Sequence, residues 1–200
     1  MMHQLRWIAT GLLALGSLTG CLGSAPGTRL YQLEPIADRP TVASMVKPVT
    51  LVVREVRLPQ YLDRPQIVTR DVGHRLQFAE FDQWAGDLRE DLTRILVENL
   101  GRLLASERVF AAPLNVAVQP DYRLEVEILR FEREAGGRVQ LTARWWLGRG
   151  SDGGLLATRE ASFSGTSATD AYSGLIAAMS VVYGDLARAI ADSVRKAASA

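Results

Sequence analysis

Near the middle of the chain runs Tyr122-Arg123-Leu124-Glu125-Val126-Glu127-Ile128, in which apolar and charged residues alternate. Such alternation is typical of a strand with one face buried and the other in water. The pair Gly136-Gly137 leads into a second stretch at 138–147, and the glycine-rich segment 148–154 leads into a third at 155–164. The sequence therefore predicts an antiparallel meander of three strands.

Two helices are predicted, one before this meander in the sequence and one after it. Asp87 with Glu90 has the form of a capping box and begins a helix that ends near Ala105. Ser167 with Asp170 repeats the signal for a second helix, which runs nearly to the end of the chain. In both segments apolar residues recur every three or four positions, so each helix has one apolar face.

Shorter strands are expected elsewhere in the chain, rich in β-branched or aromatic residues. They lie at 29–33, 49–58, 66–70 and 75–79. Asp71-Val72-Gly73-His74 between the last two reads as a hairpin turn. Together these elements predict one α+β domain over 29–200, with a mostly antiparallel sheet and both amphipathic helices packed on one face.

The first twenty residues have the order of a secretory signal peptide. One positive charge in residues 1–6 precedes an apolar run from Trp7 to Leu18, and small residues follow. As a helix this run spans only about 18 Å, less than the roughly 30 Å hydrocarbon core of a bilayer. We therefore predict a signal peptide over residues 1–20.

The motif Leu18-Thr19-Gly20-Cys21 ends that run and resembles the lipobox of bacterial lipoproteins. The resemblance implies cleavage before Cys21, a diacylglyceryl thioether on its sulfur and acylation of its amino group, with palmitate among the chains. Two or more chains anchor a protein stably. An ordinary cysteine in a plain signal peptide or anchor is the alternative. Residues 21–28 are then the lipidated cysteine and a flexible leash.

Leu22 indicates the destination of such a lipoprotein. Lipoproteins kept in the inner membrane usually have aspartate directly after the cysteine, and this chain has leucine. In a Gram-negative bacterium the periplasmic face of the outer membrane is therefore the expected location.

Composition excludes several classes of function for the mature chain. Loss of Arg6 with the signal leaves 22 basic and 22 acidic residues, so nothing indicates a nucleic-acid partner. Cys21 is the only cysteine and His74 the only histidine outside the signal, which argues against disulfides and against a metal site. We expect no cofactor.

Candidate catalytic residues have simpler structural explanations. His74 lies in a turn without a distinctive partner, and the acids Glu80, Asp82 and Asp87 stand where a helix N-terminus favours negative charge. The stretch Gly148-Arg149-Gly150-Ser151-Asp152-Gly153 has the letters of a dinucleotide fingerprint, but a strand follows it where that motif needs a helix, so a turn with positive φ is preferred. We therefore expect that the protein is not an enzyme.

Trp145 and Trp146 are neighbours in a predicted strand, so their side chains point to opposite faces. One fills the core, and the other is either covered by loops of the chain or available to a partner.

One block of sequence resembles a known family. It comprises Gln60-Tyr61-Leu62-Asp63-Arg64-Pro65-Gln66-Ile67-Val68-Thr69-Arg70 and 75–84, which ends in Phe81-Asp82-Gln83-Trp84. The block is similar to the central signature of the ABC-type transport auxiliary lipoproteins, the PqiC/YmbA-like family. Tyr31-Gln32-Leu33-Glu34-Pro35, Glu98-Asn99-Leu100 and Asp121-Tyr122-Arg123-Leu124 extend the resemblance along the mature chain.

The resemblance implies a non-catalytic outer-membrane lipoprotein that works with an MCE-domain protein, a periplasmic tunnel fed by an inner-membrane component. Such systems are thought to move lipid between membranes and to protect envelope integrity. A homo-oligomeric ring matching the tunnel is a further hypothesis. The alternatives are a structural envelope lipoprotein that binds peptidoglycan or an assembly machine and, third, a periplasmic hydrolase using His74, Glu80 and Asp82.

Residues in or near the signature, together with the paired tryptophans, are the candidate contacts with a partner. They are Tyr61, Asp63, Arg64, Arg70, Trp84, Trp145 and Trp146. The alternative for the signature is that it packs the hairpin against the first helix.

Overall fold

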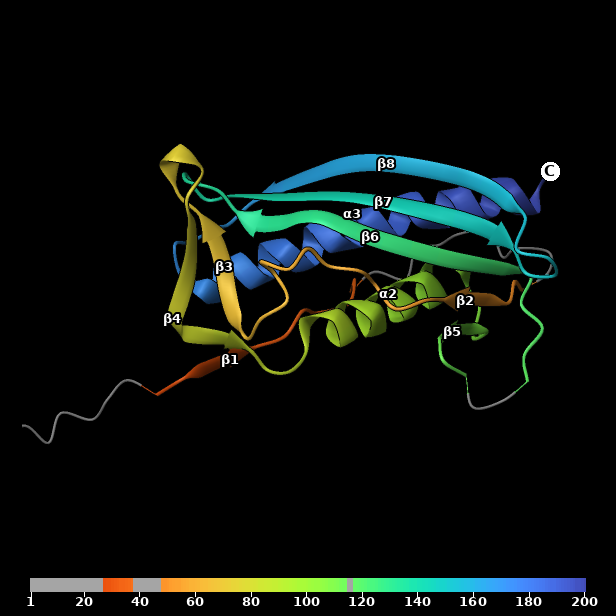
Figure 1. The fold of residues 1–200 in the computed structure, drawn as a ribbon, viewed down its shortest axis with the longest axis horizontal. Coiled ribbons are helices and arrows are strands. Elements are labelled where there is room, and N and C mark those ends of the chain that lie inside the picture. The colour runs from red at the N-terminus through yellow and green to blue at the C-terminus, as the bar shows by residue number, and fades with distance from the viewer. Residues whose placement is uncertain (1–26, 38–47, 115–116) are drawn as a thin grey trace, which may run out of the picture.

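The computed structural model describes residues 27–37, 48–114 and 117–200. The predicted signal peptide and Cys21 lie outside the described residues. Eight strands, two helices and a short 3-10 turn follow one another along the chain (Figure 1). They are β1 (Arg29–Tyr31), β2 (Leu51–Val53), β3 (Gln66–Arg70), η1 (Val72–His74), β4 (Leu76–Trp84), α2 (Leu88–Leu104), β5 (Val109–Ala111), β6 (Tyr122–Arg133), β7 (Arg138–Arg149), β8 (Leu155–Thr166) and α3 (Tyr172–Ala198).

The long antiparallel strands β6, β7 and β8 form the meander that the alternation predicts. All eight strands join one sheet in which β6 has three neighbours. Strand β7 pairs along one edge of β6, while β2 pairs near the beginning of its other edge and β3 near its end. The α+β class is confirmed.

The prediction of a mostly antiparallel sheet is wrong, because the sheet is mixed. Among the described strands, β1 with β4, β2 with β5, β2 with β6 and β3 with β6 are parallel. The partners of these parallel pairs are distant in sequence, so local alternation does not reveal their direction. Strand β2 is also shorter than expected, although the chain beyond it stays beside β6 through the Arg54 N–H to Leu124 carbonyl bond (2.9 Å).

Helix α2 begins as the capping box predicts, because the Asp87 carboxylate accepts bonds from the amides of Arg89 (2.8 Å) and Glu90 (3.1 Å). Helix α3 does not begin with the capping box predicted from Ser167 and Asp170. Its N-cap residue is Ala171, whose side chain cannot accept a hydrogen bond, and the Ser167 hydroxyl donates to the Thr169 carbonyl instead.

Helix α3 lies along the three long strands (Figure 1), and its apolar face is buried in the core. Tyr183 is fully buried at its centre, stacks on Phe131 of β6 with ring centroids 6.0 Å apart and donates to the Leu92 carbonyl in α2 (2.9 Å). Although α3 is long and apolar enough to cross a bilayer, two thirds of its most apolar window is buried in the protein. Because α2 contacts chiefly α3 and β5, the placement of both helices on one face of the sheet stays a prediction.

Candidate functional site

A buried carboxylate near the end of β6 joins two residues of the signature. Glu132 has no exposed side-chain surface. Its oxygens accept hydrogen bonds from the Tyr61 hydroxyl (2.6 Å), from Nε of Arg70 (2.7 Å) and from Nε of Arg130 (2.7 Å). Burial alone would raise the pKa of Glu132, but these three donors lower it below its ordinary value. The carboxylate therefore stays ionised inside the protein.

This cluster fastens the signature to the sheet. Tyr61 lies in the connector between β2 and β3, Arg70 ends β3, and both reach across to β6 through Glu132. Burial, followed by the bond to Glu132, raises the pKa of the Tyr61 hydroxyl far above its usual value, so it remains a donor. The Tyr61 hydroxyl thus points into the protein, and Nε of Arg70 is held against Glu132 while the Arg70 side chain stays 22% exposed.

The remaining signature candidates differ in how much surface they offer. Asp63 forms an ion pair with Arg89 of α2. Trp84 is buried where β4 ends. The guanidinium of Arg64 lies 3.9 Å from the ring centre of Phe78, whose surface is 47% exposed. Of these residues, Arg64 with Phe78 offers the largest accessible apolar surface.

The paired tryptophans take opposite sides of β7, as the alternation predicts. Trp145 is buried and its Nε1 donates to the Ser193 hydroxyl of α3 (3.3 Å). Trp146 is half-buried on the other side, which we call the outer face of β6, β7 and β8, beside Glu125 of β6. Trp146 is therefore the tryptophan that a partner can approach.

Asp82, one of the three acids considered for catalysis, serves to hold the first strand. It is buried in β4 and accepts bonds from Arg29 (2.7 and 2.6 Å) and from the Tyr31 hydroxyl (2.9 Å) in β1. The Arg29 guanidinium is the main cause of the lowered pKa of Asp82. Glu80 is exposed on the same strand. His74 has φ of 67° in the η1 turn and contacts Arg70 through its carbonyl oxygen.

We expect Asp82→Asn to loosen β1 without unfolding the domain. The neutral amide no longer attracts Arg29, so β1 should open more often. The amide of Ala85, which donates to the Tyr31 carbonyl (2.9 Å), should then exchange its hydrogen about tenfold faster, while amides of β7 keep their rates. Glu80→Gln is the matched control. Equal exchange at Ala85 in both variants would contradict this role.

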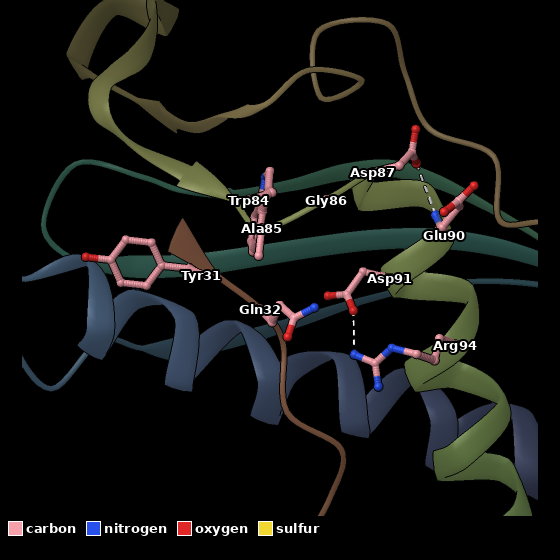
Figure 2. Close-up of a pocket in the computed structure, with 9 residues that line it drawn as sticks. All are labelled: Tyr31, Gln32, Trp84, Ala85, Gly86, Asp87, Glu90, Asp91 and Arg94. Atoms are coloured by element: carbon pink, nitrogen blue, oxygen red, sulfur yellow. Dashed lines mark hydrogen bonds and ion pairs between the residues drawn. The ribbon is translucent and has the colours of Figure 1, made fainter. Parts of the chain in front are cut away.

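Figure 2 shows a pocket of about 290 Å³ between β1, the end of β4 and the first turns of α2. Tyr31 and Trp84 contribute aromatic surface, and Asp87, Glu90 and Asp91 contribute acids. Asp87 caps the helix, while Asp91 accepts the Leu33 amide (3.2 Å) and pairs with Arg94. Two of the three carboxylates are thus already occupied in holding β1 and α2.

The described residues give little material for catalysis. No three histidine, cysteine or acidic side chains lie close enough within 27–37, 48–114 and 117–200 to hold a metal ion. Among the described residues, no histidine lines the pocket in Figure 2, and two of its three carboxylates already accept hydrogen bonds from backbone amides.

Sequence reasoning missed two residues that the structure makes important, Arg130 and Glu132. The alternation in β6 changes phase at an irregularity between Ile128 and Arg130, so Phe131 faces α3 and Glu132 faces the connector. The available signal in the sequence was Phe131-Glu132, where the alternation of apolar and charged residues that begins at Tyr122 has changed phase.

Comparison with known proteins identifies the class. The sequence model of the family described as "ABC-type transport auxiliary lipoprotein component" matches residues 31–191, and the chain belongs to this family. Membership in a lipoprotein family implies association with a membrane.

The names of individual relatives describe a more specific role than the family description does. The chain is 26% identical to "Intermembrane transport lipoprotein PqiC" of Escherichia coli (strain K12) over 192 residues, which are 96% of this chain and 98% of that protein. The protein of the same name from Shigella flexneri matches equally. Together with the family match, these relatives assign the chain an auxiliary role in transport, which implies a non-enzymatic protein.

Two solved structures share the fold. One, described only as an uncharacterized protein, has a TM-score of 0.69 at 20% identity and covers 84% of this chain and 99% of its own. Protein XCC0632 from Xanthomonas campestris has a TM-score of 0.67 at 17% identity, covering 86% and 100%.

Proposed function

We propose that this protein is the outer-membrane lipoprotein component of an MCE-type intermembrane lipid transport system. In this role it is anchored through Cys21 on the periplasmic face, docks the periplasmic tunnel protein and supports envelope integrity. The observation that carries the proposal is the family match over nearly the whole described domain, together with relatives named as intermembrane transport lipoproteins. Residues 1–20 are the signal, 21–28 the lipidated leash and 29–200 the docking domain.

The architecture supports a docking role. A leash of seven residues reaches at most about 25 Å, which keeps β1 close to the membrane. The turn between β7 and β8 lies at the opposite end of the long strands from β1 (Figure 1). A domain held at one end in this way presents its other end to a partner that arrives from the periplasm.

Cross-linked capture of the lipidated protein from its native envelope tests this function, with Cys21→Ser as the unanchored control. We expect an MCE-domain protein to be recovered with the lipidated chain. Recovery of only peptidoglycan or assembly factors would contradict the proposal and favour the structural envelope lipoprotein. A ring of several copies would appear in the same experiment as cross-links between identical chains.

A further inference from the structure

Trp146 on the outer face is flanked by two arginines. The guanidinium carbon of Arg57 lies 5.2 Å from its ring centre and that of Arg144 lies 6.0 Å away. Guanidinium groups at this distance are attracted to the negative face of an indole ring. The ring is therefore held in place at the surface, which suits a contact residue.

A pocket of about 390 Å³ opens beside Trp146. Arg54, Arg57 and Arg123 line it together with a single acid, Glu125. Arg54 and Arg57 share that acid, at 3.0 and 3.7 Å, whereas Nε of Arg123 donates to the Gly150 carbonyl (3.2 Å). Among the residues that line the pocket, positive charges exceed negative charges by two.

The excess is local to this pocket. Arg144, which flanks Trp146 outside the pocket, lies 2.6 Å from Glu160 and 3.9 Å from Glu127, so the two neighbouring strands supply two acids for this one arginine. Cross-strand pairs of this kind are expected on a solvated sheet face. The surplus of arginine beside Trp146 departs from that pattern and needs another explanation.

The backbone around the pocket is fixed before any ligand binds. The Arg57 amide donates to the Val126 carbonyl (3.0 Å), and the Arg57 carbonyl accepts from Ile128 (2.9 Å). Arg123 extends from the paired strand β6. Because the backbone that carries these side chains is already ordered, binding costs little additional backbone entropy.

We propose that this pocket and Trp146 bind an acidic segment of a protein partner. Two carboxylates would balance the excess charge, and an apolar side chain between them would pack on Trp146 and on Leu155, which is 65% exposed. A lipid phosphate fits less well, because Trp146 and Leu155 are the only apolar side chains that line the pocket and they offer little contact surface to acyl chains. The identity of the partner as the tunnel protein rests on the proposed function; the chemistry of the segment does not.

A synthetic peptide tests the chemistry without the partner. The probe is a labelled peptide in which glutamate alternates with serine around one leucine, measured by fluorescence anisotropy with the lipidated full-length protein in zwitterionic nanodiscs. We expect binding that weakens as salt is raised and that weakens about tenfold with Arg123→Glu and with Trp146→Ala. A peptide with lysine in place of glutamate should not bind.

Arg138→Glu is the matched control. Arg138 is exposed on the same strand and face as Trp146 but at the other end of β7, where it bonds to Ser164 (3.1 Å). Arg57→Gln serves as a second variant if Arg123→Glu fails to fold, as judged by circular dichroism. Equal weakening by Arg138→Glu, or no weakening by the pocket variants, would overturn the proposal.

Two further experiments distinguish this inference from the proposed function and from binding of the pocket to a membrane. Capture of the MCE-domain protein at full yield by Arg123→Glu would exclude this pocket as the dock while leaving the proposed function intact. Absence of MCE capture with the unaltered protein would refute the function, and the peptide result would still decide the pocket. Arginine-dependent binding to phosphatidylglycerol vesicles without peptide binding would overturn the acidic-segment proposal.

Discussion

Glu132→Gln is expected to lower the free energy of unfolding by about 3 kcal/mol, the lower end of the range for breaking a buried ion pair, because Arg70 loses its paired acid while Arg130 keeps Glu134 at 2.7 Å. The variant keeps the size of the side chain but removes the charge that Arg70 and Arg130 face, at 2.7 Å each. Tyr61 also loses a charged acceptor. Urea unfolding followed by circular dichroism measures the change.

Glu160→Gln is the control for this effect. Glu160 also pairs with an arginine, at 2.6 Å, but the two side chains are 49% and 40% exposed to solvent, so we expect a loss below about 1 kcal/mol. Equal losses in the two variants would show that burial of the Glu132 cluster does not strengthen it.

The same cluster gives a pH dependence with a defined sign. Because the pKa of Glu132 is lower in the folded chain than in the unfolded one, its stabilising contribution is complete above the unfolded value, about 4.3. It is lost as the pH falls through the folded value. The difference in unfolding free energy between the unaltered protein and Glu132→Gln should therefore shrink below about pH 4.

Gly150→Ala is expected to destabilise the domain by about 3 kcal/mol or more, at the upper end of the range for overpacking. An added Cβ would lie 1.7 Å from the Pro120 carbonyl oxygen and 2.5 Å from its carbon. Both are backbone atoms, so no side-chain rotation can relieve the clash. The hydrogen bond from the Gly150 amide to the Asp121 carbonyl (2.8 Å) holds the two backbone segments together. Thermal unfolding measures the loss.

Gly86→Ala is the matched control, because a Cβ there meets nothing within 4 Å. We expect its melting temperature to stay close to that of the unaltered protein. A similar temperature for Gly150→Ala would mean that the segment carrying Pro120 moves away at little cost.

These glycines show what a turn signal in sequence specifies and what it does not. The rejection of a nucleotide site in 148–153 agrees with the two strands that flank it, and Gly153 has the expected positive φ of 74°. Gly150 serves a different purpose, the close approach of a segment thirty positions earlier. That requirement depends on tertiary structure and leaves no local pattern.

The meander and the helices could be predicted because their signals are periodic and local. The alternation from Tyr122 to Ile128 and the cap at Asp87 each depend on neighbours within a few residues. The parallel strand pairs could not be predicted, because a strand of three residues such as β1 or β2 contains no information about a partner fifty or more positions away.

The candidate contacts were predictable as important residues but not in their orientation. Tyr61 and Arg70 are held by Glu132, a residue that the sequence did not single out. Trp145 and Trp146 were placed on opposite faces, but which of them faced α3 depended on the register of β7 against β6. Pairing along the sheet, which periodicity alone does not supply, decides such questions.

The pairing of β1 with β4 also bears on the order in which the chain folds. Strands β6, β7 and β8 close loops of only a few residues, whereas β1 must find a partner more than fifty positions away. Chain-closure entropy grows with that separation, so the meander is expected to form early and β1 to join late. The fast exchange expected at Ala85 in Asp82→Asn would report the reverse step. Strand β1, which lies nearest the proposed lipid anchor, is thus expected to join the sheet after the meander has formed and to detach before the meander opens.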